Sequence, residues 1–246
     1  MTEYVIKVAG EAVAVHALFE SSREYCHDYL CDENPDFSLT ISVEDLALER
    51  IKNAGLGHEE NKNLLLVPDT QLEITAIQRK LTEQLFAYDV LLFHGSAVAV
   101  DGAAYLFTAK SGTGKSTHTR LWREMLGERA VMVNDDKPFL RVTDEKITVC
   151  GSPWNGKHRL GRNIAVPLKA ICILERGPEN KIERISAEKA LPMLLQQSNR
   201  PANAAMLPKY MELLDAVASH VDFYRLQCKA EMEAAALSFQ TMSREK

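Results

Sequence analysis

The segment AKSGTGKST at residues 109–117 combines the chemical groups that a nucleoside triphosphate needs. Gly112 and Gly114 lack a Cβ, so the backbone can turn tightly and point successive N–H groups at one anion. Lys115 supplies a positive charge for the β- and γ-phosphates, and Ser116 supplies a hydroxyl for Mg²⁺. We therefore expect ATP and Mg²⁺ to bind here. The predicted nucleotide-binding residues are Ser111, Gly112, Thr113, Gly114, Lys115, Ser116 and Thr117.

Ala109 departs from the usual pattern G-x-x-x-x-G-K-[ST], which begins with glycine. This first position lies where a strand ends and mainly requires a small side chain, so alanine is compatible with the motif. The alternative interpretation is a Gly/Ser-rich turn that binds nothing. A strand, the loop, Lys-Ser and a helix follow one another in the order that phosphate binding requires, which favours the nucleotide site.

Two adjacent carboxylates, Asp135 and Asp136, end the apolar segment AVMVNDD at residues 130–136. The span between Lys115 and this segment fits one helix, so the strand should end close to the phosphates. Neighbouring residues on a strand point to opposite faces, so one carboxylate can meet Mg²⁺ while the other meets the attacking hydroxyl, if the strand bends there. The alternative is an ordinary turn, because Asp-Asp-Lys-Pro is typical of turns.

Two further segments supply candidate groups. His94, in the segment HGSA, would be structural if it stood alone, but beside carboxylates it can hold one of them or carry a proton. The segment GSPWNGKHRLGR at residues 151–162 is rich in glycine and basic residues, and such a loop can close over phosphates. Lys157 and Arg159 are its predicted phosphate contacts, and Trp154 offers an apolar surface to a substrate. The alternative is a solvated surface loop.

The elements expected around these residues bring them together. SAVAV at residues 96–100 and YLFTA at residues 105–109 flank Asp101-Gly102, a pair that favours a tight hairpin turn. The glycine-rich loop therefore leaves the second arm of an antiparallel hairpin. The segment 116–127 has the apolar spacing of a helix, whose N-terminus adds partial positive charge at the phosphates.

The distribution of apolar residues predicts the fold class. From about residue 90, strand-like runs follow closely on one another, and after residue 186 helical spacing dominates. This density of strands predicts an antiparallel or mixed sheet and an α/β (α+β) fold. The first 88 residues contain short strands and three segments expected to be helical, at residues 20–30, 43–57 and 71–88. We predict a smaller N-terminal α+β module at residues 1–88, suited to substrate recognition, and a catalytic domain at residues 89–246.

Residues 94–136 resemble the HPr kinase/phosphorylase family and the related phosphoenolpyruvate carboxykinases. The resemblance rests on HGSAVAVDG, AKSGTGKS and VNDD. It implies the P-loop core of these families for the larger domain. It also implies that Asp135 is the general base near His94, and that Asp136 lies on the Mg²⁺ side together with Ser116.

Two features separate the chain from these families. Thr117 follows the GKS sequence, where HPr kinases usually carry glutamate and the carboxykinase loop carries threonine. The chain of 246 residues is, however, much shorter than a carboxykinase, and the further metal ligands and substrate arginines of a carboxykinase are not identifiable in it. The first 88 residues show no resemblance to either family.

The composition restricts the expected partners. A net charge of −5 and a pI of about 5.8 disfavour nucleic acid. No apolar run reaches the roughly 18 residues of a membrane helix, and MTEYVIKVAGEAVAV does not have the pattern of a signal peptide. Five cysteines without C-x-x-C spacing indicate reduced thiols. We expect a cytoplasmic protein without nucleic-acid or membrane partners, and the sequence leaves homo-oligomerisation open.

These residues predict an ATP- and Mg²⁺-dependent kinase that transfers the γ-phosphoryl group to a hydroxyl. Lys157 or Arg159 would neutralise the charge on the phosphoryl group during transfer. The acceptor is a serine of a protein or peptide, or a small polyol, sugar or amino acid, and the sequence does not choose among them. Two alternatives stay open. A regulatory nucleotide-binding module would need neither Asp135 nor His94, and a phosphorylase or carboxykinase type of reaction is less favoured.

Overall fold

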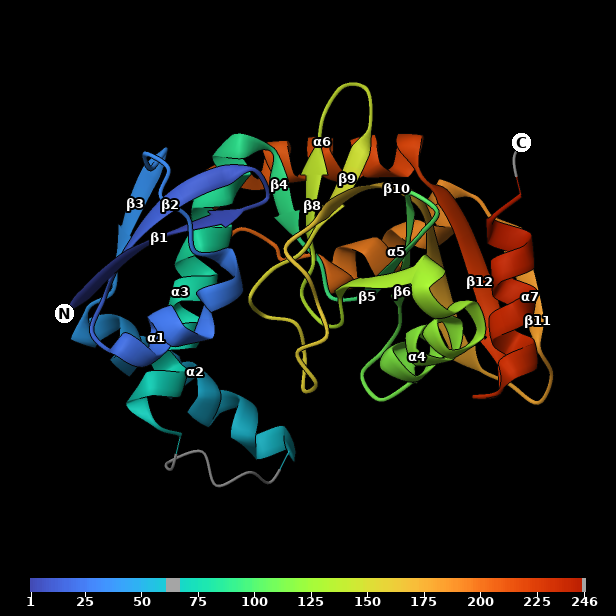
Figure 1. The fold of residues 1–246 in the computed structure, drawn as a ribbon, viewed down its shortest axis with the longest axis horizontal. Helices are drawn as coiled ribbons and strands as arrows, with labels where there is room; N and C mark the ends of the chain where they lie inside the picture. Colours follow the sequence, from blue (N-terminus) through green and yellow to red (C-terminus); the bar gives the residue numbers. More distant parts are fainter. Residues whose placement is uncertain (61–66, 245–246) are drawn as a thin grey trace. The chain divides into compact units, whose positions relative to one another are not determined.

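The computed structural model of the chain describes residues 1–60 and 67–244. Its contacts divide the chain into two compact units, Met1–Gln84 and Leu85–Lys246, whose elements are labelled in Figure 1. The sequence places the boundary at residue 88. Within the described residues no helix is both long and apolar enough to cross a membrane, and all five cysteines are free thiols.

In its described residues, the first unit is a three-stranded sheet with three helices. β1 (Thr2–Val8) and β2 (Glu11–Ala17) form an antiparallel hairpin, and β3 (Phe37–Thr40) adds parallel to β2. The helices are α1 (Glu20–Tyr25), α2 (Val43–Glu60) and α3 (Asp69–Leu85), with a 3₁₀ turn η1 (His27–Tyr29) after α1.

Charged side chains join α3 to its neighbours in this unit. Glu73 is fully buried, and its carboxylate accepts hydrogen bonds from the backbone N–H groups of Leu18 (2.5 Å) and Phe19 (3.2 Å), which follow β2. Arg79 donates to Asp45 and Glu49 on α2 at 3.0 and 2.5 Å. The third helix is therefore fixed both to the sheet and to α2.

Nine strands of the second unit form one mixed sheet. Its order is β4-β8-β9-β10-β6-β5-β7, with β12 beside β10 and β11 beside β12. β10 runs parallel to β6 and β12, and the other pairs are antiparallel. The strands are β4 (Val90–Leu92), β5 (Ser96–Val100), β6 (Ala103–Thr108), β7 (Ala130–Asn134), β8 (Phe139–Val142), β9 (Ile147–Cys150), β10 (Ala165–Arg176), β11 (Lys181–Ile185) and β12 (Asp222–Cys228).

Helices cover both faces of this sheet, because successive side chains of a strand point to opposite sides. Ala97 and Leu106 belong to one core, which includes apolar residues of α5 and α6. Their neighbours Val98 and Phe107 belong to a second core, with residues of α4 and α7. The unit is therefore a three-layer α/β structure (Figure 1). Its helices are α4 (Lys115–Leu126), α5 (Ala187–Gln197), α6 (Leu207–His220) and α7 (Met232–Met242), and its 3₁₀ turns are η3 (Phe86–Tyr88), η4 (Gly127–Arg129) and η5 (Ala204–Met206).

The predicted α/β class with a mixed sheet is confirmed, and so is the hairpin before the glycine-rich loop. Asp101 and Gly102 take positive φ values of 51° and 83° between β5 and β6, as a tight turn with two left-handed residues requires. One strand was missed. β11 has the sequence KIERI and is mostly exposed, so it carries little apolar periodicity, and it forms because it pairs with β12.

A break at His94-Gly95 separates β4 from β5, where the sequence suggests one continuous apolar run. The N–H of His94 donates to the Gln197 carbonyl (2.7 Å) and that of Gly95 to the Asp136 carbonyl (3.0 Å). A Cβ on Gly95 would lie 2.8 Å from Leu106 Cδ2 and 3.0 Å from the Phe107 carbonyl oxygen. Glycine is therefore needed where this crossing approaches β6.

We expect Gly95→Ala to lower the free energy of unfolding by about 1–3 kcal/mol, because the added methyl group overpacks this crossing. Thermal unfolding followed by circular dichroism measures the change. Gly127→Ala is a control that adds no close contact, since the space around Gly127 is open; its cost comes from the backbone alone, because φ 58° and ψ −133° are strained for alanine, at about 1–3 kcal/mol. A Gly95→Ala variant as stable as the parent protein would contradict this account of the crossing.

Candidate functional site

The glycine-rich loop leaves the buried end of β6 and leads directly into α4. Ala109 is fully buried, which explains why a small residue suffices at the place of the usual first glycine. Gly112 and Gly114 take φ values of 73° and 124°, which other residues rarely adopt. Helix α4 begins at Lys115, so the unpaired N–H groups of its first turn face the same region as the loop and suit an anion.

Lys115 lies folded back over this loop. Its Nζ donates to the carbonyl oxygen of Ala109 at 3.4 Å. Burial lowers its pKa, and the negative charges of Asp136 and Asp135 oppose that shift. The side chain is therefore a partly desolvated cation between the loop and the two carboxylates, and an anion arriving there would meet a stronger field than at an exposed lysine.

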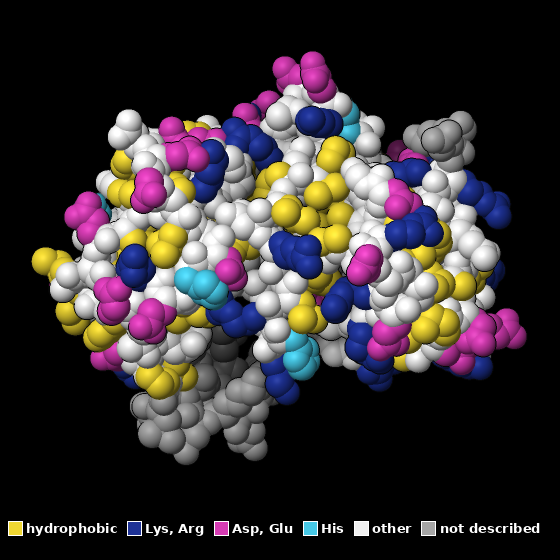
Figure 2. Space-filling view, viewed as in Figure 1, with side chains coloured by type: hydrophobic (Ala, Val, Ile, Leu, Met, Phe, Trp, Pro, Cys, Tyr) yellow, Lys and Arg dark blue, Asp and Glu magenta, His cyan; other side chains and the backbone are white. Residues whose placement is uncertain are grey.

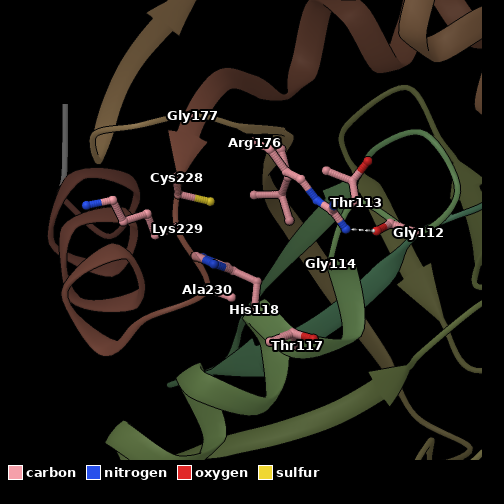
Figure 3. Close-up of a pocket in the computed structure, with 11 residues that line it drawn as sticks. Gly112, Thr113, Gly114, Thr117, His118, Arg176, Gly177, Cys228, Lys229 and Ala230 are labelled. Carbon is pink, nitrogen blue, oxygen red and sulfur yellow. Dashed lines mark hydrogen bonds between the residues drawn. The ribbon is translucent and has the colours of Figure 1, made fainter.

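A first cavity of about 400 Å³ opens on one side of the loop. In Figure 3 the loop and α4 form one wall, and the ends of β10 and β12 form the other. Arg176, the last residue of β10, donates from Nη2 to the carbonyl oxygen of Gly112 at 2.6 Å and so ties the two walls together. The lining residues are Gly112, Thr113, Gly114, Thr117, His118, Leu174, Arg176, Gly177, Cys228, Lys229 and Ala230.

His118 is a buried residue in the wall of this cavity. Burial lowers its pKa to about 4, so its ring is neutral at pH 7. Its Nε2 lies 2.9 Å from Ser238 Oγ, and the same hydroxyl accepts a hydrogen bond from Trp122 Nε1 at 2.9 Å. Ser238 belongs to α7, so this polar contact fixes α7 against α4. The sequence gives no local signal for His118, because its partner Ser238 lies far along the chain.

The two carboxylates of the AVMVNDD segment sit on a turn that Asn134 holds. The Asn134 side-chain oxygen accepts hydrogen bonds from the N–H groups of Asp136 (2.8 Å) and Lys137 (2.7 Å). Its amide donates to the Ser152 carbonyl at 3.1 Å. The pairing of β5 with β7 shifts register beside this turn, so the strand is irregular where the two carboxylates diverge.

Asp135 lies beside hydroxyl groups. Ser96 Oγ, at the start of β5, donates to its Oδ1 at 2.6 Å. Burial raises the pKa of Asp135, and hydrogen bonds from Ser96 and Ser116 oppose that rise. The result is a half-buried carboxylate with more affinity for a proton than an exposed aspartate, next to the hydroxyl of the glycine-rich loop.

Asp136 lies beside nitrogen groups instead. Its Oδ1 is 3.4 Å from His94 Nε2 and 3.3 Å from Lys137 Nζ. Burial and the positive charges of Lys137 and Lys115 lower the pKa of His94 to about 4, so the ring is neutral at pH 7. The resemblance implied that His94 lies near Asp135. The structure places it beside Asp136, because the β4–β5 crossing and the Asn134 turn meet there.

The basic loop at residues 151–162 crosses the end of β7. A Cβ on Gly156 would lie 3.4 Å from the Asp135 carbonyl oxygen, which shows how closely the loop approaches. The side chains of Lys157 and Arg159 are exposed and line none of the cavities described here. Trp154 is buried, so the expectation that it offers a surface to a substrate is wrong: its ring packs inside the protein.

A second cavity, of about 450 Å³, lies on the other side of α4. Thr117 lines both cavities, so both reach the first turn of the helix. Figure 2 shows dark blue and cyan side chains gathered over the part of the unit where Figure 1 draws α4 and the basic loop. The lining residues are Ser116, Thr117, Thr119, Arg120, Arg123, Met132, Asp135, His158 and Leu160.

The donor groups near Ser116 suit one kind of metal. No cluster of three or more His, Cys, Asp or Glu side chains that could hold a metal ion occurs among the described residues. Mg²⁺ needs no such cluster, because it keeps several waters and binds through one or two carboxylates together with substrate phosphates. The hydroxyl of Ser116 and the carboxylates of Asp135 and Asp136 are hard oxygen donors that fit this ion.

The comparisons with known proteins place this α/β chain in a family. The family model described as SynChlorMet cassette protein ScmC matches residues 62–230, well over half of the chain. The chain belongs to this family. No curated protein matches it in sequence. Among solved structures, the HPr(Ser) kinase/phosphatase from Coxiella burnetii is similar at 12% identity and a TM-score of 0.35, over 62% of this chain and 99% of that chain. Nothing about the site follows from a likeness this distant.

We expect the ring of His94 to stay neutral down to about pH 4, as its lowered pKa implies. Histidine ring spectra recorded by NMR across a pH titration measure this, with His94→Asn to assign the signal. Lys137→Met should raise the pKa of His94 because a repelling charge is removed, and Asp136→Asn should lower it further. If His94 were protonated near pH 6.5 and its pKa did not change in Lys137→Met, the described cluster would be contradicted.

Proposed function

We propose that this protein binds a nucleoside triphosphate with Mg²⁺ and transfers its γ-phosphoryl group to a hydroxyl acceptor. One observation carries the proposal: Thr117 lines both cavities, and the neighbouring Lys115 and Ser116 both interact with Asp135. Phosphoryl transfer is mainly positioning and charge stabilisation, and it needs a donor site and an acceptor site that converge on one phosphorus atom.

The first cavity suits the donor. The N–H groups of the loop and of the first turn of α4 would bind the phosphates, and Lys115 would contact the β- and γ-phosphate oxygens. The cavity between the loop and the ends of β10 and β12 has the size expected for the nucleoside. Ser116 and Asp136 would hold Mg²⁺, which when bound neutralises charge on the β- and γ-phosphates.

The second cavity suits the acceptor, because Asp135 lines it and has a raised pKa. In the proposed reaction the acceptor oxygen forms a bond to the γ-phosphorus, and the bond from that phosphorus to the β–γ bridging oxygen breaks. The acceptor proton passes to the Asp135 carboxylate, and the nucleoside diphosphate leaves. The Ser96 hydroxyl holds this carboxylate in place from the other side.

Asp136, His94 and Lys137 form the supporting part of the proposed site. His94 is neutral, so its Nε2–H can donate to Asp136 and keep that carboxylate oriented without adding a third positive charge. This assigns His94 to Asp136, on the metal side, rather than to Asp135. Lys157 and Arg159 remain proposed contacts of the transferring phosphoryl group only if the exposed loop rearranges when a nucleotide binds.

We expect Lys115→Met to weaken ATP binding by about tenfold to 100-fold, because a charge-assisted contact to the phosphates is lost. Isothermal titration calorimetry with Mg²⁺ and a non-hydrolysable ATP analogue measures the change. Lys146→Met is the matched control, since Lys146 is exposed in the turn between β8 and β9. Equal affinities of the two variants would remove the loop from the proposed site.

Substitutions of the two aspartates should affect different steps of the reaction. We expect Asp135→Asn to lower turnover by about 100-fold or more with little change in ATP affinity, because it removes the proton acceptor. Asp136→Asn should instead raise the Mg²⁺ concentration needed for half-maximal turnover. ATP consumption, screened against hydroxyl metabolites and serine peptides, measures both effects.

The same screen separates kinase from binding module. Full turnover of Asp135→Asn would refute its role as proton acceptor. ATP binding without consumption in the presence of any acceptor would favour the alternative, a nucleotide-binding module that transfers nothing.

A further inference from the structure

Cationic side chains form a row along the second cavity. Ser116, Arg120 and Arg123 lie on one face of α4, since residues three and four apart are neighbours on a helix. Arg120 follows Ser116 by about 6 Å along the helix axis, and Arg123 follows it by about 10 Å. Both arginines line this cavity together with Ser116.

These cations are available to a ligand. Arg120 pairs with Glu124 at 2.5 Å, but the two side chains are 57% and 47% exposed, and an exposed pair of this kind contributes little and exchanges easily. Arg123 has no ion pair or hydrogen bond with another side chain in the described part of the chain. His158, from the basic loop, lines the cavity opposite the helix.

The remaining lining leaves the cavity short of negative charge. Asp135 is the single carboxylate among the described residues that line it, and its oxygens already accept hydrogen bonds from Ser96 and Ser116. Met132 and Leu160 add a small apolar surface. Two arginines that line the same cavity as one proton-accepting carboxylate suit a molecule that has an anion at one end and a hydroxyl at the other.

We propose that the phosphoryl acceptor carries a carboxylate or phosphate group, bound by Arg120 and Arg123, with its hydroxyl directed at Asp135. The proposal rests on the proposed kinase function for the hydroxyl end, but the anion site stands on the arginine row alone. The separation along α4 limits the acceptor to an anion within about 5–10 Å of the hydroxyl. A free hydroxy acid or phosphate ester fits this limit, and so does a serine next to an acidic residue.

Binding tests the anion site without any activity. We expect glycerate and glycerol 3-phosphate to shift the Nε–H NMR signals of Arg120 and Arg123 at millimolar concentration, whereas glycerol does not. Arg123→Met should weaken this binding by about tenfold or more, because it removes a charge-assisted contact. Arg129→Met is the matched control, since Arg129 is exposed, pairs with Asp101 and lies outside the cavity. Thermal unfolding of each variant confirms that it is folded.

Turnover then identifies the source of the anion. ATP consumption is measured with glycerate against glycerol, and with a serine peptide flanked by aspartates against the same peptide flanked by asparagines. A preference for the anionic member of either pair supports the proposal if Arg123→Met weakens that preference by raising KM while kcat stays unchanged. The pair that shows the preference tells a free acid from a peptide.

The outcomes distinguish the two proposals. Anion binding that depends on Arg123, without ATP consumption, would refute the kinase and leave the anion site. Equal use of neutral and anionic acceptors, unaffected by Arg123→Met, would overturn the anionic acceptor and leave the kinase. If neither glycerate nor glycerol 3-phosphate shifts the arginine signals, the arginine row is an ordinary solvated helix face and the proposal is wrong.

Discussion

The buried side-chain amide of Asn134, the last residue of β7, forms hydrogen bonds through both its oxygen and its nitrogen. The oxygen accepts hydrogen bonds from the N–H groups of Asp136 and Lys137, and the nitrogen donates one to the carbonyl oxygen of Ser152. Without these bonds two backbone donors in a part-buried turn would lack partners, at a cost of about 1–3 kcal/mol each. Because Asp135 and Asp136 occupy this turn, a single buried side chain determines where both carboxylates lie and allows them to face different neighbours.

Charge around the turn is balanced before any ligand is present. Lys115 and Lys137 are set against Asp135 and Asp136, and the two lysines together with burial keep His94 neutral. A protonated His94 would add a third cation to this partly dry cluster, which explains the direction of its pKa shift. A phosphate chain entering at Lys115 would therefore meet a cation that has already lost part of its hydration, where a charge-assisted hydrogen bond is stronger than at the surface.

The local features of the sequence predicted the local parts of the structure. The Asp101-Gly102 turn, the small residue at Ala109 and the helix that begins at Lys115 all depend on neighbours within a few positions. The pairing of His94 with Asp136 was not predictable, because it follows from where the β4–β5 crossing meets the Asn134 turn. Trp154 was misinterpreted for a related reason: an aromatic residue in a glycine-rich basic segment does not reveal whether the segment folds over it.

Helix α4 lies between the two cavities, and different faces of the helix line each of them. His118 and Trp122 are buried and share the Ser238 hydroxyl, which fixes the helix against α7. Thr117 faces both cavities from the first turn. Ser116, Arg120 and Arg123, on another face of the helix, line the second cavity. The contact with α7 thus fixes the rotation of α4 about its own axis, and that rotation decides which side chains face each cavity. Ser238 lines neither cavity, yet through His118 and Trp122 it determines which side chains of the first turn face each cavity and which cations lie beyond them.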